Sequence, residues 1–530
     1  MSVKPPTLAA LADLTGGRLV ALGESDAPDG AGELPVTDAA IDARSVAVGG
    51  MFMAVPGTRA HGASFAGQSA GSCVLTDEDG LTVLRADGVQ TVVLVVDDCR
   101  AWLGPVAAEI HGHPSRSMTV IGVTGTSGKT TTSYMVERML LDDHSVGLIG
   151  TTGTRINGRA VPTSLTTPEA PTLQGLFARM RDEGVTHVVM EVSSHALVMG
   201  RVRGVDFDVA GFTNLSQDHL DFHPTMRDYF EAKSLLFTVP QDPGGELPSS
   251  VVCVDDEWGR ELAETVEDAT TVTTTGVAPA SWSVDSVEVG TDGLQHVTVT
   301  GPDNPEPTFS FPLSLPGVFN VANAVVALAC AREAGVDVST AAPTLGDVHV
   351  PGRMQTVTVG EGDTRYPQDF LALVDYAHKP GAVAAALTTL ADQLERAGHG
   401  GRVGVVLGAG GNRDHEKRPL MGAEAAKVAD LVIVTDDNPR DEEPGGIRAE
   451  VLAGAREIAN SRGADLREIG DRADAIRASV AWARRGDIVI VAGKGHETGQ
   501  IVGDTVLEFD DVAVLAQALR DRQDRQEPTR

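Results

Sequence analysis

Positive charge is scarce in this sequence. Its 42 lysine and arginine residues are outnumbered by 74 aspartate and glutamate residues, which gives a formal net charge of −32. A protein that binds the phosphate backbone of nucleic acid needs a basic face, so the composition argues against nucleic acid as a partner. Lysine is the rarer cation, with seven residues. Four of the seven lie in the motifs considered below, where a guanidinium cannot replace a primary amine.

Cysteine and long apolar runs are also scarce. The four cysteines are far apart in the sequence and show neither the spacing of a metal site nor a disulfide framework. No run approaches the roughly 18 apolar residues that a membrane span needs, and the N-terminus lacks the pattern of a signal peptide. With 42% hydrophobic residues, the chain is expected to be a cytoplasmic globular protein without membrane insertion, and we expect a monomer.

The most informative motif is a glycine-rich turn between an apolar strand and a helix, Val120-Ile-Gly-Val-Thr-Gly-Thr-Ser-Gly-Lys-Thr-Thr-Thr132. Gly125 and Gly128 let the backbone come close to a phosphate, and the N–H groups at the helix start point at its oxygens. Lys129 can neutralise the terminal phosphates, and the Thr130 hydroxyl can bind Mg²⁺. An ordinary glycine-rich turn does not explain the Gly-Lys-Thr-Thr run, so the motif predicts a short variant of the phosphate-binding loop.

Three blocks follow one another along the chain, and we predict an α/β domain for each, at residues 1–117, 118–350 and 351–530. The first has short β-rich runs separated by glycine-rich turns. The second begins with the strand of the phosphate loop and alternates strands with helices, which indicates a mostly parallel sheet. The third has a Rossmann-like, doubly wound pattern, in which ligands bind at the carboxyl ends of the strands. The polar tail after Leu519 is expected to be frayed.

Polar side chains of the second block follow its predicted strands. Glu191 ends a buried strand, where a carboxylate can hold Mg²⁺ against the phosphates; a solvent-facing glutamate that caps a loop is the alternative. Ser193 to His195 could form a hydrolytic Ser/His pair, but no oxyanion signature supports that reading. Taken alone, His219 is a hydrogen-bonded loop histidine. Lys233 lies on an amphipathic helix. Taken alone, it is a lysine whose aliphatic stem lies along apolar surface.

In their order and spacing, these motifs resemble those of the Mur ligases, which use ATP to make amide bonds in peptidoglycan precursor synthesis. The resemblance runs over nearly the whole chain. It is carried by Gly125–Thr132, Thr166–Glu169, Glu191–His195, Asn214–His223, Glu231–Lys233, Leu315–Asn323, Gly352–Gln355, Val374–His378, Gly408–Asp414 with Lys417 and Arg418, Asp437–Arg440 and Gly493–Glu497.

The resemblance implies a role for each block and a set of residues for each substrate. Residues 1–117 would bind the UDP-muramoyl dipeptide, residues 118–350 ATP and residues 351–530 the incoming amino acid. The implied catalytic residues are Lys129, Glu191, His219 and Lys233. The implied ATP-binding residues are Gly125, Thr126, Ser127, Gly128, Lys129, Thr130, Thr131, Asn320, Arg353 and Asp375. The UDP-muramoyl dipeptide would meet Thr166, Thr167, Ser193 and Arg201.

The resemblance also implies a metal ion and a covalently modified lysine in the catalytic centre. Mg²⁺ would be bound by Thr130, Glu191, His219 and Lys233, the lysine being present as a carbamate derived from CO₂. Carbamoylation converts a cation into a carboxylate-like ligand, which a magnesium site can use and an ammonium group cannot provide. The sequence departs from the family pattern at Ala43 and Met199, near the expected contacts with the nucleotide sugar.

The incoming amino acid is implied by the third block. Asp437-Asn-Pro-Arg440 resembles the family pattern for meso-diaminopimelate, whose distal carboxylate a guanidinium can bind through two hydrogen bonds. An Asx-Pro turn explains Asn-Pro but not the arginine. The residues assigned to this substrate are Arg418, Asp437, Asn438, Arg440, Gly493 and Glu497, with Glu497 suited to the distal ammonium.

The resemblance thus implies the joining of meso-diaminopimelate to the D-glutamyl γ-carboxylate of UDP-N-acetylmuramoyl-L-alanyl-D-glutamate, through an acyl phosphate. The alternatives are the L-lysine-adding ligase, a D-alanyl-D-alanine-adding ligase and a folylpolyglutamate synthetase. A nucleotide-binding switch or scaffold is an alternative of a different class, and it would not need Lys233, His219 and the third-block motifs together.

Overall fold

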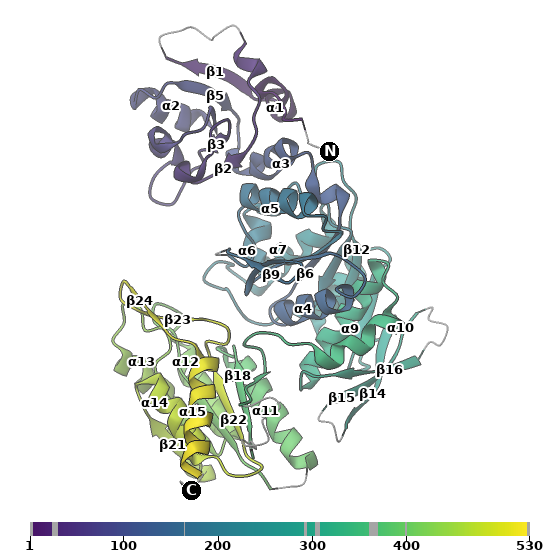
Figure 1. Cartoon of the computed structure of the whole chain (residues 1–530), viewed down its shortest axis with the longest axis vertical. Helices are drawn as coiled ribbons and strands as arrows, with labels where there is room; N and C mark the ends of the chain where they lie inside the picture. The colour runs from purple at the N-terminus through teal and green to yellow at the C-terminus, as the bar shows by residue number, and fades with distance from the viewer. Residues whose placement is uncertain are drawn as a thin grey trace. The chain divides into compact units, whose positions relative to one another are not determined.

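The computed structural model describes residues 4–23, 30–163, 165–290, 294–302, 308–359, 369–397 and 400–526. It is an α/β structure built on separate sheets, as the sequence predicts (Figure 1). The chain divides into two compact units. The first comprises Met1–Val287, His296–Pro312 and Ala322–Leu345; the second comprises Glu288–Gln295, Leu313–Val321 and Gly346–Arg530. The domain boundaries after residues 117 and 350 stay a prediction.

The first sheet of the first unit has the strand order β1-β5-β4-β3-β2. Its neighbours are parallel except β1 and β5. Alternate residues fill two cores: Met51 and Leu75 face one side, Phe52 and Val74 the other. The elements are α1 (Leu8–Thr15), β1 (Arg18–Leu22), β2 (Ala39–Ala40), β3 (Met51–Met53), β4 (Cys73–Thr76), α2 (Glu78–Ala86), β5 (Thr91–Val95) and α3 (Cys99–His111).

The second sheet carries the phosphate loop and lies in this unit except for a few residues at the ends of β14, β15 and β16. Its strand order is β16-β15-β14-β13-β12-β11-β6-β10-β7-β8-β9. The central strands β7, β10, β6, β11 and β12 are parallel. The strands of the whole sheet are β6 (Thr119–Thr124), β7 (Val146–Gly150), β8 (Gly153–Ile156), β9 (Arg159–Val161), β10 (His187–Glu191), β11 (Val209–Phe212), β12 (Ser249–Cys253), β13 (Thr270–Thr273), β14 (Trp282–Val289), β15 (Gln295–Thr300) and β16 (Thr308–Leu313).

Helices cover both faces of this sheet, with α4 and α5 on opposite sides (Figure 1). Because both faces are covered, central strands such as β10, His-Val-Val-Met-Glu, are buried along their whole length. The helices are α4 (Lys129–Leu140), α5 (Ala170–Asp182), α6 (Ser194–Val198), α7 (Met226–Thr238), α8 (Glu257–Thr265), α9 (Val318–Glu333) and α10 (Val338–Ala341). Short 3₁₀ helices cover Ala31–Glu33, Ala43–Ser45, Gly62–Gln68, Pro114–Ser117 and Ala342–Asp347.

The sheet of the second unit has the strand order β17-β18-β22-β19-β20-β21, and its strands are parallel except β17. A hairpin of β23 and β24 follows it. The strands are β17 (Gln355–Thr356), β18 (Leu371–Asp375), β19 (Val403–Leu407), β20 (Leu431–Val434), β21 (Asp465–Glu468), β22 (Ile488–Ala492), β23 (Gly499–Val502) and β24 (Thr505–Glu508). The helices are α11 (Pro380–Ala397), α12 (Lys417–Val428), α13 (Pro444–Arg462), α14 (Arg472–Trp482) and α15 (Asp511–Gln526).

The expectation of a frayed tail after Leu519 is wrong, because α15 continues to Gln526. Leu515 and Leu519 lie on one face of the helix and are buried against the sheet. Arg522 donates hydrogen bonds to the carbonyl oxygens of Val480 (2.5 Å) and Ala483 (2.7 Å) at the end of α14. The polar residues after Leu519 therefore continue a helix, which packs on the sheet through a short apolar stripe and is held to the end of α14 by Arg522.

None of the helices in the described residues combines the length and the apolar character that crossing a membrane requires.

Candidate active site

The phosphate loop connects β6 to α4 and depends on its glycines. Gly125 has φ +145° and Gly128 has φ +89°, values that favour glycine. A Cβ atom at Gly125 would lie 1.9 Å from Thr213 Oγ1, and one at Gly128 would lie 2.1 Å from Asn323 Oδ1. Both positions therefore require glycine for conformation and for space. The first N–H groups of α4 follow directly, and this is the arrangement that binds phosphate at a helix N-terminus.

The loop is held in place by residues that follow β11. The Asn214 side chain accepts a hydrogen bond from Ser127 N (3.0 Å) and donates one to Ser127 O (3.1 Å). The Thr213 hydroxyl donates to the same carbonyl oxygen at 2.7 Å. Thr126 Oγ1 and the Tyr229 hydroxyl are 3.2 Å apart. Side chains from the neighbouring strand end and helix therefore hold the loop, and Thr130 and Thr131 are buried at the start of α4.

Two lysines meet at one carbonyl oxygen of the loop. Lys129 Nζ donates to Gly125 O (2.8 Å) and Thr126 O (3.1 Å). Lys233, on α7, also donates to Gly125 O (2.8 Å), and its side chain is 1% exposed. The Lys233 ammonium lies 4.7 Å from the centroid of the Tyr229 ring. Two of the seven lysines thus concentrate positive charge at the loop, where a polyphosphate carries negative charge.

Glu191 lies at the end of β10, next to β7 in the sheet. It is 1% exposed and accepts hydrogen bonds from Thr151 N (2.8 Å) and Thr151 Oγ1 (3.0 Å). Thr151 Oγ1 is also 3.1 Å from Thr166 Oγ1. In the described part of the chain no arginine, lysine or histidine lies within ion-pair distance of the Glu191 carboxylate. A buried anion without a cation is costly, so the site fits a divalent cation.

The residues predicted for the UDP-muramoyl dipeptide form one cluster beside Glu191. The Thr167 hydroxyl donates to Glu191 O (2.8 Å) and accepts from Ser193 N (3.2 Å). Arg201 forms an ion pair with Glu169 (2.8 Å) and donates to Thr167 O (3.4 Å). Ser193 caps α6 by accepting from Ala196 N (3.2 Å). The predicted set is thereby gathered, while its contact with substrate stays a prediction.

His219 lies in a loop of aromatic and imidazole rings. Its backbone has φ +53°, and its Nε2 atom is 3.1 Å from Asp218 Oδ2. The His195 ring is 5.0 Å from that of His219 and stacks at 4.0 Å on Phe222. In the described ranges, no group of three or more histidine, cysteine, aspartate or glutamate side chains is placed to hold a metal. The predicted magnesium ligands depend instead on a threonine and a modified lysine besides Glu191 and His219.

Asn320, Arg353 and Asp375, which the sequence predicts for ATP, belong to the second unit. Asp375 ends β18 and accepts hydrogen bonds from Met354 N (2.7 Å) and Ala377 N (2.8 Å). Burial raises the pKa of Asp375, against the lowering effect of Arg353. The Arg353 guanidinium stacks 4.1 Å above the Tyr376 ring. The structure therefore brings Arg353 and Asp375 together at a strand end, as predicted for the third block.

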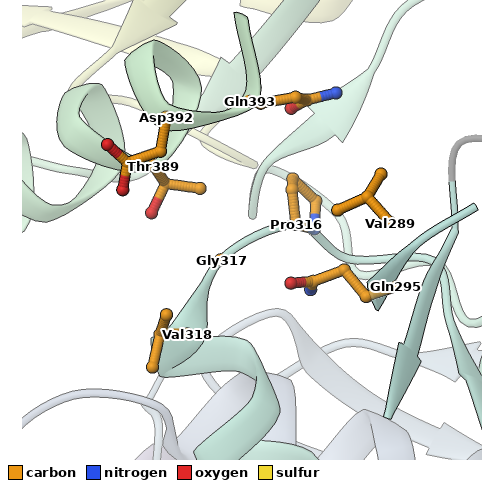
Figure 2. Close-up of a pocket in the computed structure, with 8 residues that line it drawn as sticks. All are labelled: Val289, Gln295, Pro316, Gly317, Val318, Thr389, Asp392 and Gln393. Carbon is orange, nitrogen blue, oxygen red and sulfur yellow. The ribbon is translucent and has the colours of Figure 1, made fainter. Parts of the chain in front are cut away.

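The loop before Asn320 lines a small cavity of about 40 Å³. Figure 2 shows Pro316 and Gly317 on this loop and Val318 at the start of α9, with Thr389 and Asp392 on α11 nearby. Asn320 itself donates to Pro316 O at 2.8 Å. Ligand pockets take about 300–1,000 Å³, so this cavity does not hold a purine base, and the role of Asn320 stays a prediction.

The residues predicted for diaminopimelate gather where β20 and β22 end. Asn438 Nδ2 donates to Glu497 Oε2 (2.9 Å). Lys494, which is fully buried, donates to Asn438 Oδ1 (3.0 Å) and Glu497 Oε2 (3.4 Å) and lies 3.8 Å from Asp437 Oδ1. Gly493 has φ +120°, and a Cβ atom there would lie 2.8 Å from Asp437 Oδ2. The parallel strands β20 and β22 flank β19 in the sheet, and their ends thus bring two distant motifs into contact.

The two predicted arginines of this site differ in their partners. Arg418 is 1% exposed and binds Glu442 (2.9 Å) and Glu450 (3.0 Å), and its hydrogen bonds lower the pKa of Glu442 to about 2. Arg440 donates to Gly411 O (2.8 Å) and, in the part of the chain described, has no carboxylate within ion-pair distance. Its backbone, at φ +53°, donates to Ile501 O on β23 and accepts from Gly503 N, just after that strand. Arg440 can therefore bind a carboxylate of a ligand, whereas Arg418 already binds two.

Three contributors to these sites were not predicted as site residues. Thr151 follows β7 and binds Glu191, Lys494 lies inside the third-block cluster, and Arg472 forms a fully buried ion pair with Asp511 (2.7 Å). Arg472 also donates to Ala492 O at 3.0 Å, next to Gly493. For Lys494 the sequence carries a signal, because lysine is scarce in this chain and Lys494 lies within the Gly-Lys-Gly-His-Glu motif. For Thr151 and Arg472 the sequence carries no local signal.

The fold and these sites define a P-loop enzyme with a separate Rossmann-like unit. The family model described as the Mur ligase middle domain matches residues 123–331, and that of the Mur ligase, glutamate ligase domain, matches residues 352–495. A relative from Corynebacterium glutamicum, named UDP-N-acetylmuramoyl-L-alanyl-D-glutamate--2,6-diaminopimelate ligase, is 53% identical over 498 residues, 93% of each chain. The chain belongs to the Mur ligase family, and the predicted family and enzyme class are confirmed.

Solved structures agree with this assignment. A structure titled with the same ligase name is 28% identical, with a TM-score of 0.62, and the match covers 95% of this chain and 99% of the other. A MurF ligase from Thermotoga maritima in complex with ADP has a TM-score of 0.61 at 17% identity, covering 93% and 99% of the two chains. That second likeness shows the fold alone.

Proposed function

We propose that this chain joins meso-diaminopimelate to the D-glutamyl γ-carboxylate of UDP-N-acetylmuramoyl-L-alanyl-D-glutamate, with conversion of ATP to ADP and phosphate. The observation that carries the choice of amino acid is the Arg440 guanidinium, which lacks a carboxylate partner in the described residues. Asn438, on the same loop after β20, binds Glu497, which follows β22. A diamine with a second carboxylate supplies an anion for Arg440 and a second cation, besides Lys494, for Glu497. The names of the relatives support the same substrates.

The reaction proceeds through an acyl phosphate. The γ-carboxylate oxygen attacks the γ-phosphorus of ATP in line, the bond to the β–γ bridging oxygen breaks, and ADP leaves. Lys129 and the N–H groups at the start of α4 stabilise the transferred phosphoryl charge. The amino group at the L-centre of diaminopimelate then attacks the acyl carbon, and phosphate leaves from a tetrahedral intermediate.

The chain's own residues fit a divalent cation at the first step. Thr130 and the buried Glu191 would hold Mg²⁺, with His219 and the Lys233 carbamate as further ligands. The oxygen donors of Thr130, Glu191 and the carbamate suit Mg²⁺, while His219 would add a nitrogen ligand. When bound, Mg²⁺ would supply charge neutralisation at the phosphates. Thr151 orients the Glu191 carboxylate. In this proposal Glu191 is a metal ligand and not a general base.

Thr166, Thr167, Ser193 and Arg201 would position the dipeptide, and Arg353 and Asp375 the phosphate and ribose of ATP. Residues 1–117 would hold the UDP-sugar. We further propose that the enzyme acts as a monomer in the cytoplasm, on soluble nucleotide-linked substrates and without nucleic acid. The acidic net charge of −32 accords with the last point.

Phosphate release from ATP by the purified chain tests the proposal. We expect release only when Mg²⁺, the UDP-muramoyl dipeptide and meso-diaminopimelate are all present, with one tripeptide product per phosphate. Phosphate release that does not depend on the dipeptide would contradict the ligase assignment. Product formed with a folate substrate would replace it with the folylpolyglutamate alternative.

A further inference from the structure

Lys494 is the buried lysine of the second unit that the proposed reaction does not use. It follows β22 within the Gly-Lys-Gly-His-Glu motif, and its side chain is 0% exposed. A buried ammonium is costly unless its hydrogen bonds are satisfied. Here it is surrounded by acceptors, with Asn438 Oδ1 at 3.0 Å, Glu497 Oε2 at 3.4 Å and Asp437 Oδ1 at 3.8 Å.

The acceptors of Lys494 come from two motifs that are far apart in the sequence. Asn438 belongs to the loop after β20, and Glu497 lies after β22. Asn438 Nδ2 donates to the same Glu497 oxygen, Oε2, at 2.9 Å. Lysine, amide and carboxylate thus form a closed triangle of hydrogen bonds, in which the position of each group fixes the other two.

The triangle is itself anchored from both sides. Ile501 N, on β23, donates to Asn438 Oδ1 at 3.0 Å, and Gln500 Nε2 donates to Asp437 O at 2.8 Å. On the other side, the fully buried Arg472 donates to Ala492 O (3.0 Å) and pairs with Asp511. Burial raises the pKa of Asp437, while Arg472 and Lys494 lower it. Several hydrogen bonds therefore hold the groups around Lys494, and the Glu497 carboxylate is the partly exposed member, with 34% of its side chain exposed.

From this geometry we infer that Lys494 is a positioning residue for the incoming diamine: it holds the Asn438 amide and the Glu497 carboxylate so that Glu497 receives the distal ammonium of the substrate. Lys494 and Asn438 both bind Oε2, and the Tyr376 side chain also contacts the Glu497 carboxylate. In this proposal the substrate ammonium binds the part of the carboxylate that these three groups leave accessible. This inference rests on the proposed function, and it assigns a task to a side chain that does not itself touch substrate.

The alternative is that Lys494 is only a structural counter-ion for Asp437. The two roles differ in what they predict. A counter-ion affects the folding of the whole unit and every substrate alike, whereas a positioning residue affects the affinity for the diamine and acts through Glu497. Loss of Lys494 removes a charged hydrogen bond that orients the Glu497 carboxylate. It is therefore expected to weaken diamine binding about 30-fold.

The test measures KM for each of the three substrates in Lys494→Met, Glu497→Gln and the double variant, with thermal melting to establish folding. We expect Lys494→Met to raise KM for meso-diaminopimelate about 30-fold and to leave KM for ATP and for the UDP-muramoyl dipeptide within about twofold. In the Glu497→Gln background the same change should raise KM for meso-diaminopimelate by less than about threefold, because the group it orients is already neutral. Lys427→Met, at an exposed lysine of α12 paired with Glu424, is the matched control and should change none of the constants.

An equal rise in all three KM values, or a full effect of Lys494→Met in the Glu497→Gln background, would overturn the positioning role. If Lys494→Met does not melt cooperatively, Lys494→Arg keeps the charge and changes the geometry. That variant should fold and still raise KM for meso-diaminopimelate, and an unchanged KM would overturn the inference. Absence of diaminopimelate-dependent product in the unmodified enzyme would overturn the proposed function as well, which separates the two failures.

Discussion

Thr151 donates to both oxygens of the Glu191 carboxylate, from its backbone N–H to Oε1 at 2.8 Å and from its hydroxyl to Oε2 at 3.0 Å. Glu191 ends β10, and Thr151 directly follows the adjacent parallel strand β7. Thr151 alone therefore fixes the orientation of the buried Glu191 carboxylate, as a metal ligand requires. This explains how an anion without a cationic partner in the described residues remains ordered beside the phosphate loop.

Replacement of Thr151 by valine removes the hydroxyl and keeps the backbone donor. We expect kcat/KM for ATP to fall about 10- to 100-fold, because a hydrogen bond to a charged group contributes about 1.5–3 kcal/mol. Steady-state kinetics at saturating dipeptide and diamine measure the change. Thr151→Ser, which restores a hydroxyl, should recover most of the loss; a serine variant as impaired as the valine variant would contradict this role of Thr151.

Lys233 is the residue for which we predict a carbamate. Preparations stripped of CO₂ should lose activity, and bicarbonate should restore it, because an ammonium group cannot act as a metal ligand. The intact protein should gain the mass of one carbon dioxide under mild native mass spectrometry. In Lys233→Arg both the activity and the response to bicarbonate should be absent. Full activity in CO₂-free buffer would show that the lysine acts unmodified.

Arg440 is expected to set the preference between meso-diaminopimelate and L-lysine. Arg440→Met should lower kcat/KM for meso-diaminopimelate by about 10- to 100-fold, since a charged, bidentate pair is lost. The rate with L-lysine, which lacks the second carboxylate, should change much less. A parallel loss with both amino acids would assign Arg440 to the shape of its loop, whose backbone is pinned to β23, and not to the substrate.

His187 makes stability depend on pH. Burial, and then the charge of His144, lower the pKa of His187 from 6.5 to about 4. Between pH 6.5 and about pH 4, His187 binds a proton in the unfolded chain but not in the folded chain. The stability that neutral, buried His187 contributes is therefore present above pH 6.5 and is lost as the pH falls toward 4. The rings of the two histidines are 4.1 Å apart, and protonation would place charge in a poorly solvated pair.

We therefore expect the free energy of unfolding of the native chain to fall from pH 7 to pH 4.5 by about 2 kcal/mol more than that of His187→Asn. Chemical denaturation followed by fluorescence at the two pH values measures this difference. His349→Asn, at an exposed position, is the control and should follow the native chain. Identical pH dependence of the native chain and His187→Asn would refute the assignment.

The sequence predicted the parts of the site that lie within single motifs. The glycines at 125 and 128, the lysine and threonine after them and the glutamate at the end of β10 are local signals of a strand end and a helix start. The contact between Thr151 and Glu191 depends on β7 lying next to β10, and a strand order does not follow from strand patterns. The same holds for Lys494, whose partners are brought together by the pairing of β22 and β20 with β19.

The error at the C-terminus has a comparable origin. The residues after Leu519 are polar, and their helix is held by Leu515 and Leu519 and by the Arg522 bonds to the end of α14. Both anchors are tertiary contacts, so composition alone predicted a frayed end. The fold class was predictable because the alternation of strands and helices is repeated many times, whereas each of these contacts occurs once.

The central claim is most directly tested by competition in one reaction. The purified chain is supplied with ATP, Mg²⁺ and UDP-N-acetylmuramoyl-L-alanyl-D-glutamate together with equal concentrations of meso-diaminopimelate and L-lysine, and the products are separated by mass spectrometry. We predict a product that contains diaminopimelate in excess of about tenfold over the lysine product. Equal amounts of the two products, or a majority of the lysine product, would contradict the assignment of Arg440 and the proposed substrate.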